Sequence, residues 1–242
     1  MAATPNHAPT IGGEALDFYL SQGYYRMHQD LFTCRFLPVD DAYYTVHWLR
    51  IVLPDVSFGS EQRRLLRIND QFSVTIRPLQ LTDELESLYA RYRSAITFNA
   101  PATVEEFLLN GATSNVFHTD VIEIRDNQEL IAAGIFDSGA CSVAGIMNFY
   151  HPDYRKYSLG KYLMLLKINH ARHQRKTHYY PGYVVHNYPK FDYKLFACPA
   201  ATQVFDSTTN LWLPFSWATV AAQSASLMAE WLEENLVDDA TE

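Results

Sequence analysis

Apolar positions recur along most of the chain with the periods of helices and strands. Helices are expected over residues 14–23, 60–70, 82–96, 103–111, 158–176 and 224–239. Strands rich in aromatic and β-branched residues are expected over 31–38, 43–53, 72–79, 120–125, 129–137, 141–150 and 178–185. The segment 158–176 has the clearest helical pattern, because Leu159, Tyr162, Leu163 and Leu166 fall on one face.

The order of these elements favours a mixed sheet. After residue 70 the chain runs strand, helices, strands, long helix and strand, which is typical of an α/β or α+β fold with helices flanking one sheet. The turn 126–128 predicts a hairpin, and Thr82 and Ser158 occupy expected N-cap positions. We expect a small amino-terminal α/β region at 1–70 and the main domain at 71–242.

The composition indicates a globular protein with reduced cysteines. Apolar residues make up 48% and charged residues 19% of the 242 positions. Cys34, Cys141 and Cys198 are widely spaced without a CxxC pair, so we expect a cytoplasmic protein without a local metal site. The first thirteen residues lack a leader pattern, and no apolar run approaches the roughly 20 residues of a membrane span, so no membrane partner is expected.

Charge is distributed unevenly along the chain. The net charge is −8, but the window 155–194 carries nine Lys or Arg residues and a single acid, Asp192. A basic segment on an acidic body is typical of a protein that binds an anionic partner. A solvated helix face, balanced by acids elsewhere in the fold, would give the same composition.

Two stretches of this window carry candidate chemistry. Residues 155–161, RKYSLGK, lie between a strand and a helix, where cations and backbone N–H groups bind anions such as phosphate. Residues 182–194, GYVVHNYPKFDYK, set Lys190 and Lys194 among aromatic residues. These lysines are candidates for binding an anionic substrate group, whereas surface lysines with their stems on tyrosine rings would show the same pattern.

Residues 148–172 and 179–199 resemble the carboxyl-terminal domain of the aminoacyl-tRNA–protein transferases, the arginyl- and leucyl-transferases of the N-degron pathway. The matching positions are Phe149, Tyr150, Pro152, Ser158, Leu159, Gly160, Tyr162, Tyr179, Gly182, Tyr183, Lys190, Phe191, Tyr193 and Lys194. Upstream, residues 23–26 are similar to the family's G-(F/W)-R-R element, and residues 60–69 are similar to its S-x-Q-R-R-x-x-x-x-N element. The family's clustered cysteines are missing apart from Cys34, so the chain resembles a divergent member with no metal.

The resemblance implies an enzyme with a GNAT-like fold that transfers arginine or leucine from charged tRNA to the N-terminal α-amino group of acceptor proteins, which marks them for degradation. Aminoacyl-tRNA would be the co-substrate, and no cofactor would be needed because the aminoacyl ester is already activated. Acceptors with acidic or other destabilising N-termini would be the protein partners. Proximity and orientation would supply much of the rate.

Roles for individual residues follow from the resemblance. Tyr183 and Tyr193 would orient the acceptor or donate to the oxyanion, and His186 would act as a base. Substrate binding is assigned to Lys190, Lys194, Arg26, Ser158 and Gly160, the last two by shaping the start of a helix. Contacts with tRNA are assigned to Arg63, Arg64, Arg67, Arg155, Lys156, Lys161, Arg172 and Arg175. Core aromatics, a structural histidine and solvated surface cations are the alternatives.

Two other functions fit parts of the sequence. A CoA-dependent GNAT acyltransferase binds pyrophosphate with a Q/R-x-x-G-x-G/A loop, and residues 155–160 match this loop except for Ser158 in place of the first glycine. A non-catalytic binder of acidic N-terminal peptides would keep the same fold.

Overall fold

A computed structural model describes residues 10–239 of the chain. Its helices are α1 (Gly13–Ser21), α2 (Ser60–Asn69), α3 (Asp83–Ala95), α4 (Val104–Leu109), α5 (Leu159–His173) and α6 (Trp217–Asp239). Its strands are β1 (Tyr25–Met27), β2 (Asp30–Phe32), β3 (Phe36–Val39), β4 (Ala42–Val52), β5 (Ser73–Pro78), β6 (Thr119–Asp126), β7 (Glu129–Ser138), β8 (Ser142–Tyr150), β9 (His178–Val185), β10 (Thr202–Asp206) and β11 (Leu211–Pro214). Most of the amino-terminal segment expected to lack a leader lies outside the described residues.

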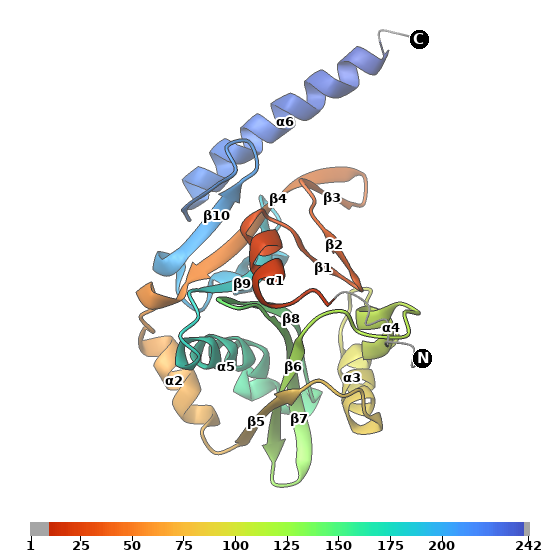
Figure 1. The fold of residues 1–242 in the computed structure, drawn as a ribbon, viewed down its shortest axis with the longest axis vertical. Coiled ribbons are helices and arrows are strands. Elements are labelled where there is room, and N and C mark those ends of the chain that lie inside the picture. Colours follow the sequence, from red (N-terminus) through yellow and green to blue (C-terminus); the bar gives the residue numbers. More distant parts are fainter. Residues whose placement is uncertain (1–9, 240–242) are drawn as a thin grey trace, which may run out of the picture.

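Nine strands form one mixed sheet in the order β11–β10–β4–β9–β8–β7–β6–β5, and β3 pairs with the first part of β4. Neighbouring strands are antiparallel except β8 and β9, which are parallel and are connected through α5. Helices α2 and α5 cover one face of the β6–β8 part of the sheet, and α3 and α4 cover the other (Figure 1). The predicted mixed sheet flanked by helices and the predicted hairpin at 126–128 are confirmed.

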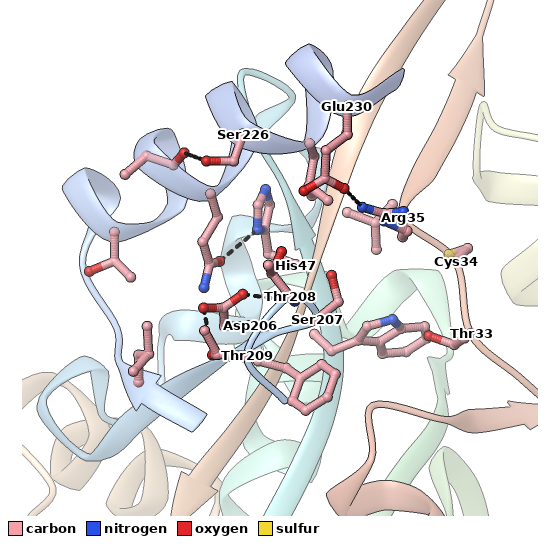
Figure 2. A pocket seen from close by; sticks show the side chains of 18 residues that line it. Thr33, Cys34, Arg35, His47, Asp206, Ser207, Thr208, Thr209, Ser226 and Glu230 are labelled. Atoms are coloured by element: carbon pink, nitrogen blue, oxygen red, sulfur yellow. Dashed lines mark hydrogen bonds and ion pairs between the residues drawn. The ribbon is translucent and has the colours of Figure 1, made fainter. Parts of the chain in front are cut away.

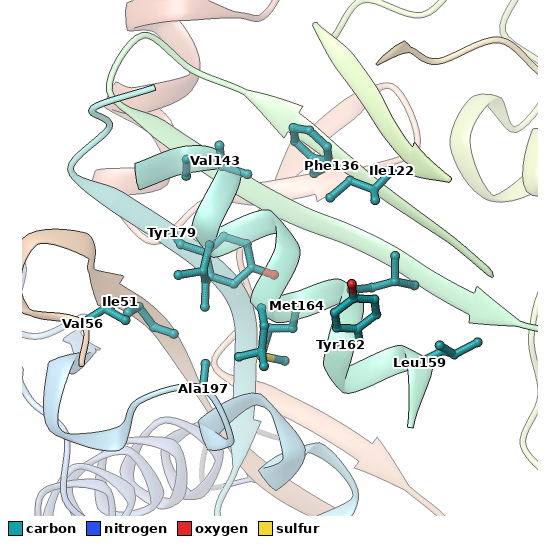
Figure 3. Close-up of a cluster of buried hydrophobic side chains, with 14 of the residues drawn as sticks. Ile51, Val56, Ile122, Phe136, Val143, Leu159, Tyr162, Met164, Tyr179 and Ala197 are labelled. Carbon is teal, nitrogen blue, oxygen red and sulfur yellow. The ribbon is translucent and has the colours of Figure 1, made fainter. Parts of the chain in front are cut away.

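The largest core cluster lies beneath α5. Leu159 and Leu163 are fully buried, as the apolar face of this helix predicts. Figure 3 shows Tyr162 and Met164 of α5 in the same cluster as Phe136 of β7. Each fully buried side chain of this size contributes about 1.5–3 kcal/mol. This burial fixes α5 on the sheet, and with it the position of the helix start at the carboxyl end of β8.

The amino-terminal region shares the sheet with the rest of the chain. β4 lies between β9 and β10, whereas β1 and β2 form a separate two-stranded sheet. The boundary predicted at residue 70 falls between α2 and β5 and stays a prediction. Strands from both sides of it belong to one sheet.

Several local predictions need correction. The single strand predicted over 31–38 is wrong: the chain leaves the small sheet after β2 and joins β4 as β3, so the residues between them belong to neither ladder. The last helix begins earlier than predicted, at Trp217, and the short strands β1, β10 and β11 were not predicted. Thr82 caps α3 with its side chain as predicted, whereas Ser158 has a φ of 51° and makes no side-chain cap.

Candidate functional site

The two parallel strands of the sheet separate along their length. β8 and β9 pair only where residues 142–144 face residues 178–180, although β8 continues to Tyr150 and β9 to Val185. The start of α5 lies at the same carboxyl end as this opening. Ligands of open α/β sheets gather where neighbouring strands diverge at their carboxyl ends. We therefore take the opening between β8 and β9 as the centre of the candidate site.

Tyr25 fills the point at which the strands begin to part. Its hydroxyl lies 2.6 Å from the carbonyl oxygen of Gly145 in β8 and 2.9 Å from that of Tyr180 in β9. A hydroxyl has one proton, so the two carbonyls share it. Burial raises the pKa of Tyr25 well above its usual value, so this hydroxyl stays protonated. The sequence analysis found the element at 23–26 but assigned a role only to Arg26.

Arg26 holds the Tyr25 segment in place. The guanidinium donates to Asp137 at 2.9 Å, to Thr119, to Asn115 and to the carbonyls of His28 and Leu108. These contacts engage all five N–H groups of the side chain. Asp137 is completely buried, and this burial raises the pKa of its carboxyl to about 6. The predicted contact of Arg26 with substrate would require one of these bonds to break.

Lys194 lies beneath the end of β9. Its ammonium donates to the carbonyl of Tyr183 at 2.8 Å and lies 4.4 Å from the ring centre of Tyr183 and 4.9 Å from that of Phe191. Gly182 makes room for it: the residue has a φ of +97°, and an added Cβ would lie 3.1 Å from the Lys194 Nζ. The side chain is buried, and burial lowers the pKa of Lys194 to about 7.

The two lysines of the stretch 182–194 lie in different surroundings. Lys190 is exposed, with its Nζ 4.5 Å from the ring centre of Phe98, whereas Lys194 is buried. Asp192 does not neutralise them by a hydrogen bond, because its buried Oδ1 has no partner within residues 10–239. Tyr193 is half exposed.

The structure separates the proposed base from the proposed oxyanion donor. Tyr183 packs on Trp48 and Phe191, and burial raises the pKa of Tyr183 to about 12. His186 instead lines a cavity of about 360 Å³ together with Trp217 at the start of α6. Tyr183 thus belongs to the aromatic wall around Tyr25, while His186 belongs to the α6 side.

The start of α5 is connected to α2. Gln62 donates to the carbonyl of Phe196 at 2.6 Å, and Asn69 donates to the carbonyl of Tyr157 at 3.1 Å. Both amides come from the element at 60–69 that the sequence singled out. Asn148 also donates to the carbonyl of Gly160 in the first turn of α5. The Asn69 bond holds the short helical segment at 152–157 beside α2, and the Gln62 bond joins α2 to the segment that follows Lys194.

The predicted tRNA contacts divide into two groups. The first group surrounds the start of α5, where exposed cations of α2 adjoin two exposed cations and the half-buried Lys161; its members are Arg63, Arg64, Arg67, Arg155, Lys156 and Lys161. Arg172 and Arg175 lie at the opposite end of α5, about 20 Å away at a rise of about 1.5 Å per residue. The basic window therefore does not form one continuous surface, and only the first group adjoins the opening between β8 and β9.

A second cavity was not predicted. It measures about 410 Å³ and lies between β4, the β10–β11 turn and α6 (Figure 2). His47 forms its floor, bonded to Gln223 and Ser224, and burial lowers the pKa of His47 to about 4. Arg35 and Glu230 form an ion pair in its lining. Trp48 lines this cavity and also stacks on Tyr25, so the cavity adjoins the candidate site.

No group of three His, Cys, Asp or Glu side chains within residues 10–239 could hold a metal ion. None of the helices in this range is long and apolar enough to cross a membrane.

Comparisons with known proteins identify relatives. The family model "Arginine-tRNA-protein transferase, C terminus" matches residues 84–202. An aspartate/glutamate leucyltransferase of Hahella chejuensis is 30% identical over 165 residues, which cover 66% of this chain and 69% of the relative. A protein of the same name from Leptospira interrogans is 26% identical over 213 residues, covering 84% of this chain and 79% of the relative.

Two solved structures are similar to parts of this chain. L-PGS from Bacillus licheniformis has a TM-score of 0.42 at 11% identity and covers 71% of this chain and 50% of that one. The ribosomal-protein-S18-alanine N-acetyltransferase of Escherichia coli has a TM-score of 0.32 at 18% identity, with 42% and 61% covered. The sequence relatives, which match along most of their own length, establish the family. This chain belongs to the aminoacyl-tRNA–protein transferase family, as its sequence motifs predict.

Proposed function

We propose that the protein transfers leucine from charged tRNA to the α-amino group of acceptor proteins that begin with Asp or Glu, and so marks them for degradation. Family membership and the names of the relatives support the reaction type, the amino acid and the acceptors. The structural observation that supports this proposal is the burial of Lys194. Its ammonium lies buried beside the opening between β8 and β9, with one oxygen acceptor within the described residues.

The chemistry needs two substrates and no cofactor. The acceptor amine attacks the ester carbonyl of the aminoacyl-tRNA, an amide bond forms, the ester C–O bond breaks, and the terminal ribose hydroxyl of tRNA leaves with a proton. The ester is already activated, so ATP and a metal ion are not required. Holding amine and ester together contributes up to about 7–11 kcal/mol in favourable cases.

The residues around the opening would divide the work. Tyr183 has a hydroxyl that stays protonated at neutral pH, so it suits an oxyanion donor and not a base. Lys194 would bind the acceptor's carboxylate. The carboxylate oxygens would accept hydrogen bonds from the N–H groups of the ammonium that do not bond to the carbonyl of Tyr183. The basic residues around the start of α5 would receive the tRNA backbone. His186 and Tyr193 stay predictions for proton transfer and acceptor orientation.

The test is a transfer assay with purified protein. Labelled leucyl-tRNA and arginyl-tRNA are each offered with peptides that begin with Asp, Glu, Arg, Lys or Ala, before and after treatment with a chelator. We expect leucine transfer to the Asp and Glu peptides, unchanged by the chelator. Transfer from neither charged tRNA would overturn the proposal. Acyl transfer from acetyl-CoA would then favour a CoA-dependent enzyme, and peptide binding without turnover would favour a binder.

A further inference from the structure

The antiparallel pairing of β7 and β8 contains a bulge at the place where β8 leaves β9. Ile135 pairs with Met147 and Phe136 pairs with Gly145, so Ile146 is an extra residue in β8. The last pair between β8 and β9 joins Ala144 to Tyr180, directly before the bulge. An extra residue bends its strand, raises the local twist and leaves its own backbone groups outside the ladder. The bulge therefore determines where the two parallel strands separate.

Lys167 of α5 reaches this bulge from the face of the sheet that α2 and α5 cover. Its Nζ donates to the carbonyl of Ile135 at 2.7 Å, to the carbonyl of Met147 at 3.1 Å and to Asn148 Oδ1 at 2.8 Å. Three acceptors match the three N–H groups of an ammonium. Lys167 is 1% exposed, so no solvent competes for these bonds. The two carbonyls belong to the residue pair beside the register shift.

The surrounding chain is adapted to this lysine. An added Cβ at Gly134 would lie 3.1 Å from the Lys167 Cε and 2.9 Å from Leu163 Cδ2, so a larger residue there would displace the lysine or the helix. Asn148, which accepts from Lys167, donates through its Nδ2 to the carbonyl of Gly160. One connected set of bonds thus joins the bulge in β8 to the first turn of α5, which begins at the carboxyl end of β8.

We propose that Lys167 is a positioning residue for aminoacyl transfer: by holding the bulge at Ile146 against α5, it sets the separation of β8 and β9 in which ester and amine meet. This inference rests on the proposed function. Lys167 does not touch either substrate, because it lies behind the strand. Its removal is expected to leave substrate affinity unchanged and to lower turnover, since a displacement of about 1 Å in a reacting pair can cost about 100-fold.

The test compares Lys167→Met, which keeps an unbranched side chain one atom shorter and removes the three bonds, with Met164→Ala, which destabilises the same buried helix away from the bulge. Both variants are assayed under conditions in which circular dichroism shows that they are folded. We expect kcat for leucine transfer to fall roughly 10- to 100-fold in Lys167→Met, with KM for charged tRNA and for peptide changed less than about twofold. Met164→Ala should keep the wild-type kcat. Equal kcat losses in the two variants, or none in Lys167→Met, would overturn the proposal.

A second measurement does not depend on activity. Hydrogen exchange of the peptide covering residues 143–150 should become faster in Lys167→Met and stay unchanged in Met164→Ala. If Lys167→Met does not fold, Asn148→Ala removes one of the three acceptors and should show the same kcat loss to a smaller extent; an unchanged kcat there contradicts the proposal. Wild-type protein that transfers nothing refutes the proposed function, and unchanged exchange in the bulge refutes the role of Lys167.

Discussion

Two buried lysines lie on either side of the opening between β8 and β9, and they differ in the oxygen atoms around them. Lys167 donates to three acceptors, whereas Lys194 donates to the carbonyl of Tyr183 and otherwise faces aromatic rings within the described residues. Burial lowers the pKa of both to about 7. A buried charge is costly unless it is paired. The ammonium of Lys167 has an acceptor for each of its three N–H groups, whereas the ammonium of Lys194 has N–H groups left to donate to a substrate carboxylate.

Removing Lys194 should give the largest effect on acceptor choice. In Lys194→Met we expect kcat/KM for an Asp-initiated peptide to fall about 10- to 100-fold, which corresponds to about 1.5–3 kcal/mol for a lost charge-assisted contact. Transfer to an Ala-initiated peptide should change much less. If Lys194→Met keeps the wild-type preference for Asp over Ala, Lys194 does not bind the acceptor's carboxylate. An equal fall in kcat/KM for all peptides would indicate that Lys194 binds tRNA instead.

The pH profile tests the charge on Lys194 directly. With a pKa of about 7, the ammonium loses its proton as pH rises through neutrality, so kcat/KM for acidic acceptors should fall by about tenfold per unit above that pH. In Lys194→Met this descending limb should vanish. A rate that rises through pH 7 in the wild type and not in the variant would instead identify Lys194 as a general base.

Stability against pH tests whether burial lowers the pKa of both lysines in the folded protein. Their folded pKa lies near 7, below the ordinary value of 10.5, so the unfolded chain binds more protons between these limits. The free energy of unfolding should therefore rise with pH across this interval, by at most about 1.4 kcal/mol per unit for each lysine. In urea unfolding, Lys194→Met and Lys167→Met should flatten this slope by similar amounts, since burial lowers the pKa of both lysines to about 7. A variant that leaves the slope unchanged would show that its lysine is not depressed in pKa in the folded protein.

Surface cations should give the smallest single effects. Affinity for charged tRNA should fall with salt with a log–log slope of roughly −2 to −4 for about three to five contacts. Reversing Arg63 and Lys156 to Glu should make the slope shallower by roughly 1 to 2, whereas reversing Arg172 and Arg175 should not. The reverse order would show that the far end of α5 receives the tRNA.

Much of the fold follows from local pattern. The apolar face of α5, the hairpin at 126–128 and the cap of α3 at Thr82 depend on residues close together in the chain, so periodicity and turn chemistry predict them. The strand predicted over 31–38 failed because pairing partners, and not propensity, decide where a ladder ends. The short strands β10 and β11 carry too few residues for a period to be seen.

The candidate site was predicted in its segments but not in its geometry. Motif spacing identified the stretch 182–194 and the element at 23–26. Within that element the motif predicted substrate binding for Arg26 and no role for Tyr25. Lys167 was counted only as one cation of the basic window. His186 and Tyr183, which are close in sequence, lie in different surroundings.

By itself, the sequence determined the family, the mixed sheet and the segments that carry the site, because motifs and periods are properties of neighbouring residues. Only the tertiary structure decided that Lys190 is exposed, that Lys167 is buried with three hydrogen-bond acceptors, and that Lys194 is buried with one acceptor within the described residues. Tyr25 meets Tyr180 across 155 positions, and Lys167 meets Ile135 across 32. Such contacts form only when distant strands and helices pack, and burial among those elements sets the charge state and the role of each side chain.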